Sequence, residues 1–278
     1  MSESRRGDPK PISGLDMAPT ISWYTTNKDK LSKLLPPSVE EPSPFPTMDG
    51  DYFSITDGEI ASLVALFPER AILRSRLNTG SVIGKPTLYF AKGATPDDIK
   101  TTGAEEEALS PTAIIPSYTD NERWQNTGRL SSDVWLFHIP EGVDPVVRRI
   151  IHAQGFVHEL AHTIATQALY SEGYGLEFLD GRVRRAYDYL IEFANAAEKY
   201  APISHYSSFY RKKGEELKSL VAIEEELVET IAALLLGFAF SPDKSKRLDP
   251  LADRPDVRRF IVDFLHAKAI TLPVESSS

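Results

Sequence analysis

Residues 144–169 read DPVVRRIIHAQGFVHELAHTIATQAL, and the rest of the chain is expected to fold around this stretch. Asp144 followed by Pro145 is a typical helix start, because the carboxylate can cap the first turn and proline fits the first helical position. No further proline occurs in the stretch, and apolar residues recur at helical spacing along it. The sequence therefore predicts one long, mostly buried helix that ends near residues 171–173.

Within this helix, residues 158–162 read His-Glu-Leu-Ala-His, the HExxH pattern that is typical of zinc metallopeptidases. Side chains four positions apart lie above one another on a helix, so His158 and His162 can direct their imidazoles at one metal ion. Glu159 lies beside them and can reach a water molecule on that metal, where a carboxylate acts as the general base of hydrolysis. An accidental match on a surface helix is the alternative, and the apolar flanks argue against it. We expect one zinc ion per chain.

A catalytic zinc site needs a third protein ligand, and the chain has no cysteine to supply it. No HxxGxxH arrangement continues the motif, so an acidic residue is the best candidate. Residues 222–234 read AIEEELVETIAAL, a helix that starts acidic and continues apolar. Glu225 and Glu229 share a face, which is unfavourable for two like charges unless one meets zinc and the other a metal-bound imidazole. The alternative is that residues 224–226 only complement the positive end of the helix dipole.

Two further segments, ISHYSS at 203–208 and EELVETI at 225–231, resemble a known family when they are read together with HExxH. Their pattern is similar to the signature of the catalytic domain of anthrax lethal factor and of the Pro-Pro endopeptidases, which are gluzincin peptidases. The resemblance covers roughly residues 145–268. It implies an α+β, zincin-like fold, in which a small mixed sheet is followed by a mainly helical lobe that carries the HExxH helix.

The resemblance also implies a role for individual residues. The zinc ligands that it implies are His158, His162 and Glu225. Glu159 is then the general base, and Tyr206 hydrogen-bonds the oxyanion of the tetrahedral intermediate. Glu229 is implied to orient one of the ligand histidines.

The sequence departs from the family pattern between the tyrosine and the ligand glutamate. Tyr206 and Glu225 lie further apart than is usual, because a charged insert at residues 209–220 separates them. The insert can form a flap over the cleft, in which case Tyr210 takes the place of Tyr206. Glu226, one position along the helix, is the alternative ligand to Glu225.

The composition limits the partners of the protein. The chain has 278 residues, of which 41% are hydrophobic and 26% charged, an ordinary globular balance. A net charge of −9 without a basic stripe argues against nucleic-acid binding. No stretch reaches the ~20 apolar residues that cross a bilayer, so no membrane partner is expected. No signal peptide is visible, which favours a cytoplasmic location, and a peptide or protein substrate is the expected partner.

Three regions follow one another along the chain. Residues 1–50 hold eight of the 20 prolines and are predicted to be a proline-rich arm that is extended or partly disordered. The arm could pack on the body through Ile21, Trp23 and Tyr24, and residues 28–35 could form a short helix. Residues 51–142 are predicted to be an α/β sub-domain with a helix at 57–77 and strands at 87–91, 112–116 and 133–139. Residues 143–278 are predicted to be an almost entirely helical, zinc-binding catalytic sub-domain, with further helices at 180–200, 221–240 and 253–269.

Two questions stay open at the level of sequence. The strand at 133–139 leads into the metal helix and is either an edge strand, which could pair with an extended peptide, or an interior strand. The function is predicted to be that of a zinc-dependent metalloendopeptidase. The alternative is a zinc-binding pseudo-peptidase that acts as a protein-interaction module, which a blocked cleft would favour.

Overall fold

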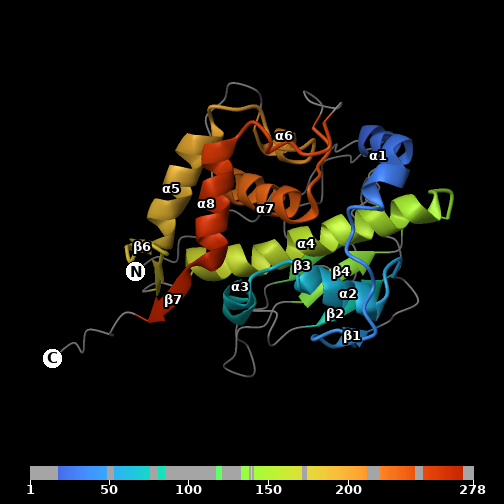
Figure 1. The fold of residues 1–278 in the computed structure, drawn as a ribbon, viewed down its shortest axis with the longest axis horizontal. Helices are drawn as coiled ribbons and strands as arrows, with labels where there is room; N and C mark the ends of the chain where they lie inside the picture. Colours follow the sequence, from blue (N-terminus) through green and yellow to red (C-terminus); the bar gives the residue numbers. More distant parts are fainter. Residues whose placement is uncertain are drawn as a thin grey trace, which may run out of the picture.

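The computed structural model describes residues 18–48, 53–75, 81–85, 117–120, 133–137, 139, 141–170, 174–211, 220–241 and 247–271. These residues form an α+β structure built around the helix α4, Pro145–Tyr170. Helix α4 lies across the middle of the molecule, with the helix α7, Leu220–Leu236, on one side and a sheet on the other (Figure 1). Its predicted start is confirmed, because the Val146 amide donates to Asp144 Oδ1 at 2.8 Å.

The first sheet is small and mixed. Its strands, in spatial order, are β1 (Thr47–Met48), β2 (Val82–Lys85), β4 (Asp133–Phe137) and β3 (Ser117–Asp120). The first three are parallel, and β3 is antiparallel to β4. Strand β4 therefore has a neighbour on each side, so the edge interpretation of this strand is wrong, and β3 ends the sheet in the described part of the chain. The strands predicted at 87–91 and 112–116 lie outside the described residues.

Two short helices, α2 (Asp57–Val64) and α3 (Glu69–Arg74), replace the single helix predicted over residues 57–77. The break comes at Pro68, because proline lacks an amide hydrogen and its ring clashes with the preceding turn. The start of α2 is fixed by a capping box, in which the side chain of Thr56 accepts from the Glu59 amide and the Glu59 carboxylate accepts from the Thr56 amide.

Helix α1, Ala18–Leu31, occupies part of the region that the prolines predicted to be extended. One proline, Pro19, falls inside it, and it lies in the first turn, where proline is tolerated. Trp23 and Tyr24 are buried against aromatic residues that follow α7. The extended conformation is therefore wrong for this segment, and the short helix expected at 28–35 coincides only with the end of α1.

The C-terminal half contains further helices, most of them predicted, and a second sheet that the sequence did not predict. The remaining helices are α5 (Ala186–Ala197), α6 (Ser207–Tyr210) and α8 (Pro255–His266). The strands are β5 (Tyr174–Glu177), β6 (Val183–Arg185) and β7 (Lys268–Thr271), which form an antiparallel sheet in the order β6-β5-β7. The helices predicted at 180–200 and 253–269 are correspondingly shorter. These segments form strands because β5 pairs with the distant β7, and such pairing cannot be predicted from local periodicity.

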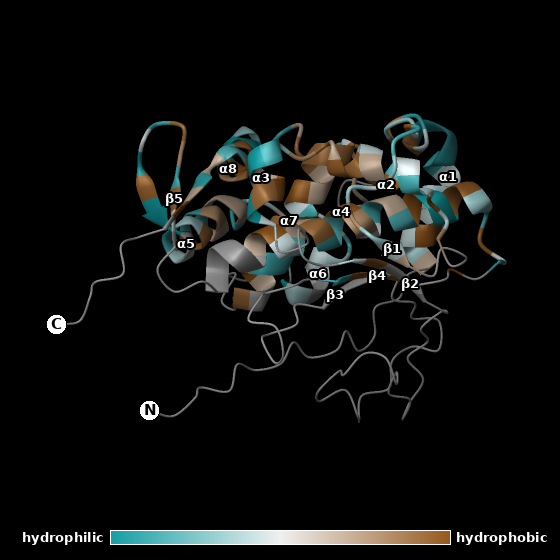
Figure 2. Ribbon diagram, turned by 90° about the horizontal axis from the view of Figure 1, so that it is seen from below, coloured by the Kyte–Doolittle hydropathy of each residue, from teal (hydrophilic) through white to brown (hydrophobic). Residues whose placement is uncertain are grey.

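The core is formed where α4 meets its neighbours. Fully buried residues of α4, among them Phe156, Val157 and Leu160, pack in the same core as Leu227 and Val228 of α7. Hydrophobic residues recur along both helices in the centre of the molecule (Figure 2). The packing places the acidic start of α7 beside the HExxH turns of α4. No described helix, α4 included, is long and apolar enough to cross a lipid bilayer.

Candidate metal centre

Three side-chain atoms from α4 and α7 converge on one point. The Nε2 atoms of His158 and His162 lie 3.1 Å apart. Glu225 Oε2 lies 3.6 Å from His158 Nε2 and 3.5 Å from His162 Nε2. Ligand atoms held at roughly 2.0–2.1 Å from a tetrahedral zinc ion lie about 3.4 Å from one another. The triangle therefore has the size that one metal ion requires, and the structure brings the predicted Glu225 together with both histidines.

The second nitrogen of each ring faces a carboxylate. His158 Nδ1 lies 2.7 Å from Glu229 Oε1, and His162 Nδ1 lies 3.1 Å from Glu224 Oε1. Because a carboxylate only accepts, the hydrogen of each neutral imidazole belongs on Nδ1, and both Nε2 atoms present lone pairs. Glu225 Oε2, which they meet, is buried and has no hydrogen-bond partner among the described residues. When both rings are neutral, three electron-rich atoms therefore face one another, an arrangement that a cation between them would stabilise.

The electrostatics of the site favour positive charge. Burial by itself lowers the pKa of both imidazoles, but the neighbouring carboxylates outweigh it. Glu229 raises the pKa of His158, and Glu225 with Glu224 raises the pKa of His162 well above its ordinary value. Burial acts to raise the pKa of Glu229, and His158 outweighs this, so that the pKa of Glu229 is lowered. The carboxylates therefore stabilise a cation between α4 and α7.

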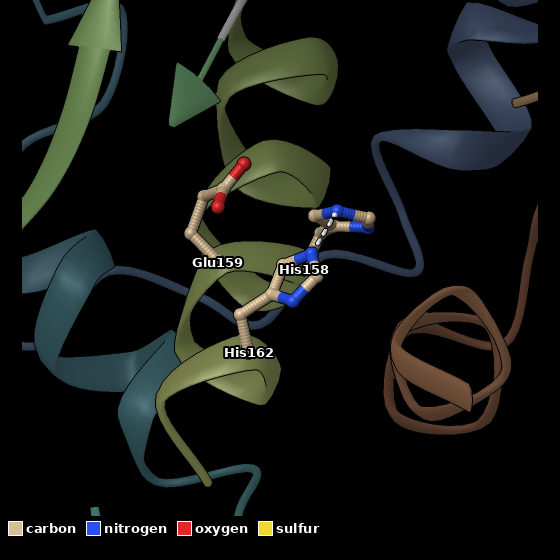
Figure 3. A group of neighbouring side chains, drawn as sticks. All are labelled: His158, Glu159 and His162. Atoms are coloured by element: carbon tan, nitrogen blue, oxygen red, sulfur yellow. Dashed lines mark hydrogen bonds between the residues drawn. The ribbon is translucent and has the colours of Figure 1, made fainter. Parts of the chain in front are cut away.

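Glu159 lies beside the two imidazoles and not between them (Figure 3). Together, His158, Glu159 and His162 form a largely buried cluster whose ligand atoms lie within 4.8 Å of one another, and this cluster could hold a metal ion. Glu225 approaches the same histidines from the facing helix and more closely than this limit. Of the two carboxylates, Glu225 is the better placed third ligand, and Glu159 flanks the site.

Two tyrosines from the segment before α7 lie at the same site. The ring of Tyr206 stands edge-on to that of His158, with the ring centroids 5.4 Å apart. Its hydroxyl oxygen lies 3.4 Å from that of Tyr210. Burial, and next the charge of Glu225, raise the pKa of both phenols, so both keep their hydrogen and can donate it. The structure thus brings together the predicted tyrosine and its alternative.

Glu226, the alternative ligand, has other partners. Its Oε1 atom accepts from the Ile203 amide and from Arg211 Nη2, each at 3.1 Å. The side chains of Glu226 and Arg211 are both 2% exposed. An oxygen that already accepts from a guanidinium and an amide is poorly suited to bind a metal, so the geometry favours Glu225 over Glu226.

Sequence reasoning missed the contact between Glu224 and His162. The interpretation that residues 224–226 only complement the helix dipole is incomplete, since Glu224 and Glu225 meet the histidines and Glu226 meets Arg211. The sequence placed Glu225 and Glu229 on the face that meets α4, but the row of three glutamates did not show that Glu224 also reaches His162. That information depends on the packing of two helices that are distant in the sequence.

Replacing Glu224 by alanine should weaken metal binding by about 10–100-fold, because His162 loses the carboxylate that orients its ring. Titration of the metal-free protein with zinc in the presence of a competing chelator measures this change. Binding should still reach one ion per chain at saturation. The same substitution at Glu69, which is exposed on α3, is the control and should leave the affinity unchanged. An unchanged affinity in the Glu224 variant would contradict the orienting role.

Comparison of the chain with protein-family models, with curated proteins and with solved structures gave no match.

Proposed function

We propose that the protein is a zinc-dependent metalloendopeptidase of the gluzincin type, with a zincin-like fold. The proposal rests on one observation: the Nε2 atoms of His158 and His162 lie close to each other and to the buried Glu225 Oε2. In the described part of the chain, this oxygen has no hydrogen-bond partner. The proposed ligands of one zinc ion are His158, His162 and Glu225. A zinc ion held there would polarise the scissile carbonyl and activate water for attack.

The residues around the ligands support the proposal, because each can be given a step of hydrolysis. Glu159, which flanks the imidazoles, takes the proton of the attacking water and delivers it to the leaving amine. A phenol hydroxyl of Tyr206 or Tyr210 donates to the oxygen on which negative charge develops. Glu224 and Glu229 hold the two imidazoles in the tautomer that leaves Nε2 as the ligand atom.

The arrangement of the first sheet supports an extended substrate. Strand β3 contacts α4 and ends the sheet among the described residues. The backbone groups on the outer side of such a strand can pair with a peptide in extended conformation, and the peptide would then run beside the HExxH helix. Such pairing would suit either an endopeptidase or a protein-interaction module, and β3 would then take the role that the sequence left open for β4.

Tyr206→Phe protein should keep its zinc and lose about 10²–10³-fold in kcat, because it lacks one donor to the developing oxyanion. Steady-state kinetics on a cleaved peptide, with zinc content measured on the same samples, tests this. Tyr210→Phe is the matched variant, since the two hydroxyls lie 3.4 Å apart. A large loss in the Tyr210 variant alone would show that Tyr210, and not Tyr206, donates to the oxyanion. Full activity in both variants would show that neither tyrosine takes part in the reaction.

The function itself is tested by incubating the zinc-loaded protein with a diverse peptide library and sequencing the products. Cleavage that disappears when zinc is removed and returns when it is restored is the expected result. Stoichiometric zinc without cleavage of any peptide would favour the pseudo-peptidase.

A further inference from the structure

One buried carboxylate holds both ends of the segment that carries the two tyrosines. The segment is residues 203–211, with Tyr206 and Tyr210 in its interior. Glu226 Oε1 accepts from the amide of the first residue, Ile203, and from the guanidinium of the last, Arg211, each at 3.1 Å. The tyrosines are thus enclosed between two bonds to the same atom of α7.

The interior of the segment is closed by its own hydrogen bonds. The Ser204 amide donates to Ser207 Oγ at 3.1 Å, and the Ser207 amide donates to Ser204 Oγ at 3.0 Å. Ser207 Oγ also donates to the Ser204 carbonyl at 3.2 Å. At the far end, Arg211 Nη1 donates to the carbonyl of Ala197, the last residue of α5, at 3.2 Å. A segment that is tied at both ends and within its turn has little freedom to move its tyrosines.

The ion pair between Glu226 and Arg211 that anchors the segment is buried, and its burial indicates what the pair contributes. Glu226 and Arg211 are both 2% exposed, and a buried ion pair is seldom more stabilising than apolar residues of the same volume. It does supply directional hydrogen bonds, which fix the orientation of the groups that they join. The anchor also directly follows Glu225 in the sequence, so successive residues of α7 meet the two histidines and fix the tyrosine segment.

We propose that Glu226 and Arg211 are positioning residues that hold residues 203–211 on α7, so that the Tyr206 and Tyr210 hydroxyls are in place at the metal site before a substrate binds. The inference rests on the proposed function and adds the two residues that position the tyrosine hydroxyls. Neither residue touches the reacting atoms, and both act through the tyrosines.

A double-mutant cycle between Glu226→Ala and Tyr206→Phe tests this. Glu226→Ala should lower kcat by about 10-fold or more at unchanged KM and zinc content, because the phenol is no longer fixed where the oxyanion develops. Tyr206→Phe should then cost about tenfold less in the Glu226→Ala background than in the parent protein, since both changes remove part of the same interaction. Glu226→Gln keeps an acceptor oxygen for Ile203 and Arg211 and should retain most of the activity. Effects of Glu226→Ala and Tyr206→Phe that multiply independently would overturn the proposal.

A second measurement separates this inference from the proposed function. Amide hydrogen exchange of the metal-free protein should be faster over residues 203–211 in Glu226→Ala and Glu226→Gln/Arg211→Met than in the parent, with α4 unchanged. If the parent cleaves no peptide, the cycle is measured on the affinity of the zinc-loaded protein for acetohydroxamate. Unchanged exchange over 203–211, or independent effects on that affinity, would overturn the anchoring role whether or not the protein is a peptidase.

Discussion

Glu159→Gln protein should retain its zinc and its fold and lose peptide hydrolysis by 10²–10⁴-fold or more, the typical contribution of a general base. Glutamine has the size and shape of glutamate, so the flank of α4 on which Glu159 lies keeps its packing. An amide cannot take up the proton of the attacking water, and the step that depends on it is lost. The loss should appear in kcat, because a general base acts on the transition state and not on substrate binding.

The measurement is the steady-state rate on one cleaved peptide, with zinc content and thermal melting on the same sample. Glu69→Gln, an exposed change on α3, is the control for substitution of a glutamate and should be fully active. Wild-type rates in the Glu159 variant would show that the base is elsewhere.

Removal of the guanidinium from the buried pair should have the largest effect on stability. Arg211→Met removes the guanidinium that bonds the buried Glu226 and leaves only the weaker charge interaction with Arg254, so it should lower the free energy of unfolding by up to about 3–5 kcal/mol. The matched change, Arg258→Met, breaks a pair with Asp249 in which the side chains are 52% and 37% exposed. It should cost no more than about 1 kcal/mol, because water screens an exposed pair.

Urea denaturation of the metal-free proteins, with the midpoint and the slope fitted together, measures both changes. Arg211→Met/Glu226→Leu should recover most of the stability lost in Arg211→Met, since apolar residues can replace both members of a buried pair. A double variant no more stable than the single one would show that the loss comes from packing of the arginine stem and not from the unpaired charge.

The parts of the fold that the sequence predicted are those that local patterns determine. The Asp144–Pro145 start and the apolar repeat define α4, and i, i+4 spacing is enough to bring His158 and His162 together. The acidic beginning of α7 could be predicted to supply the third ligand, because a buried carboxylate on an apolar helix requires a partner.

The features that the sequence did not predict depend on contacts between distant segments. Strand β5 pairs with β7, nearly a hundred residues later, and each strand alone is too short for a periodic signal. Helix α1 was obscured by the prolines on either side of it, although Pro19 suits a first helical turn. The different partners of Glu224, Glu225 and Glu226 follow from the rotation of α7 against α4, which composition and spacing do not contain.

His158, His162 and Glu225 are proposed to hold a single metal ion between α4 and α7. Elemental analysis of purified protein after zinc loading and removal of loosely bound metal tests this most directly, when the parent is compared with Glu225→Ala and Glu226→Gln. One zinc per chain in the parent and in Glu226→Gln, with the site empty in Glu225→Ala, is the predicted result. A full equivalent of zinc in Glu225→Ala, or none in the parent, would contradict the account.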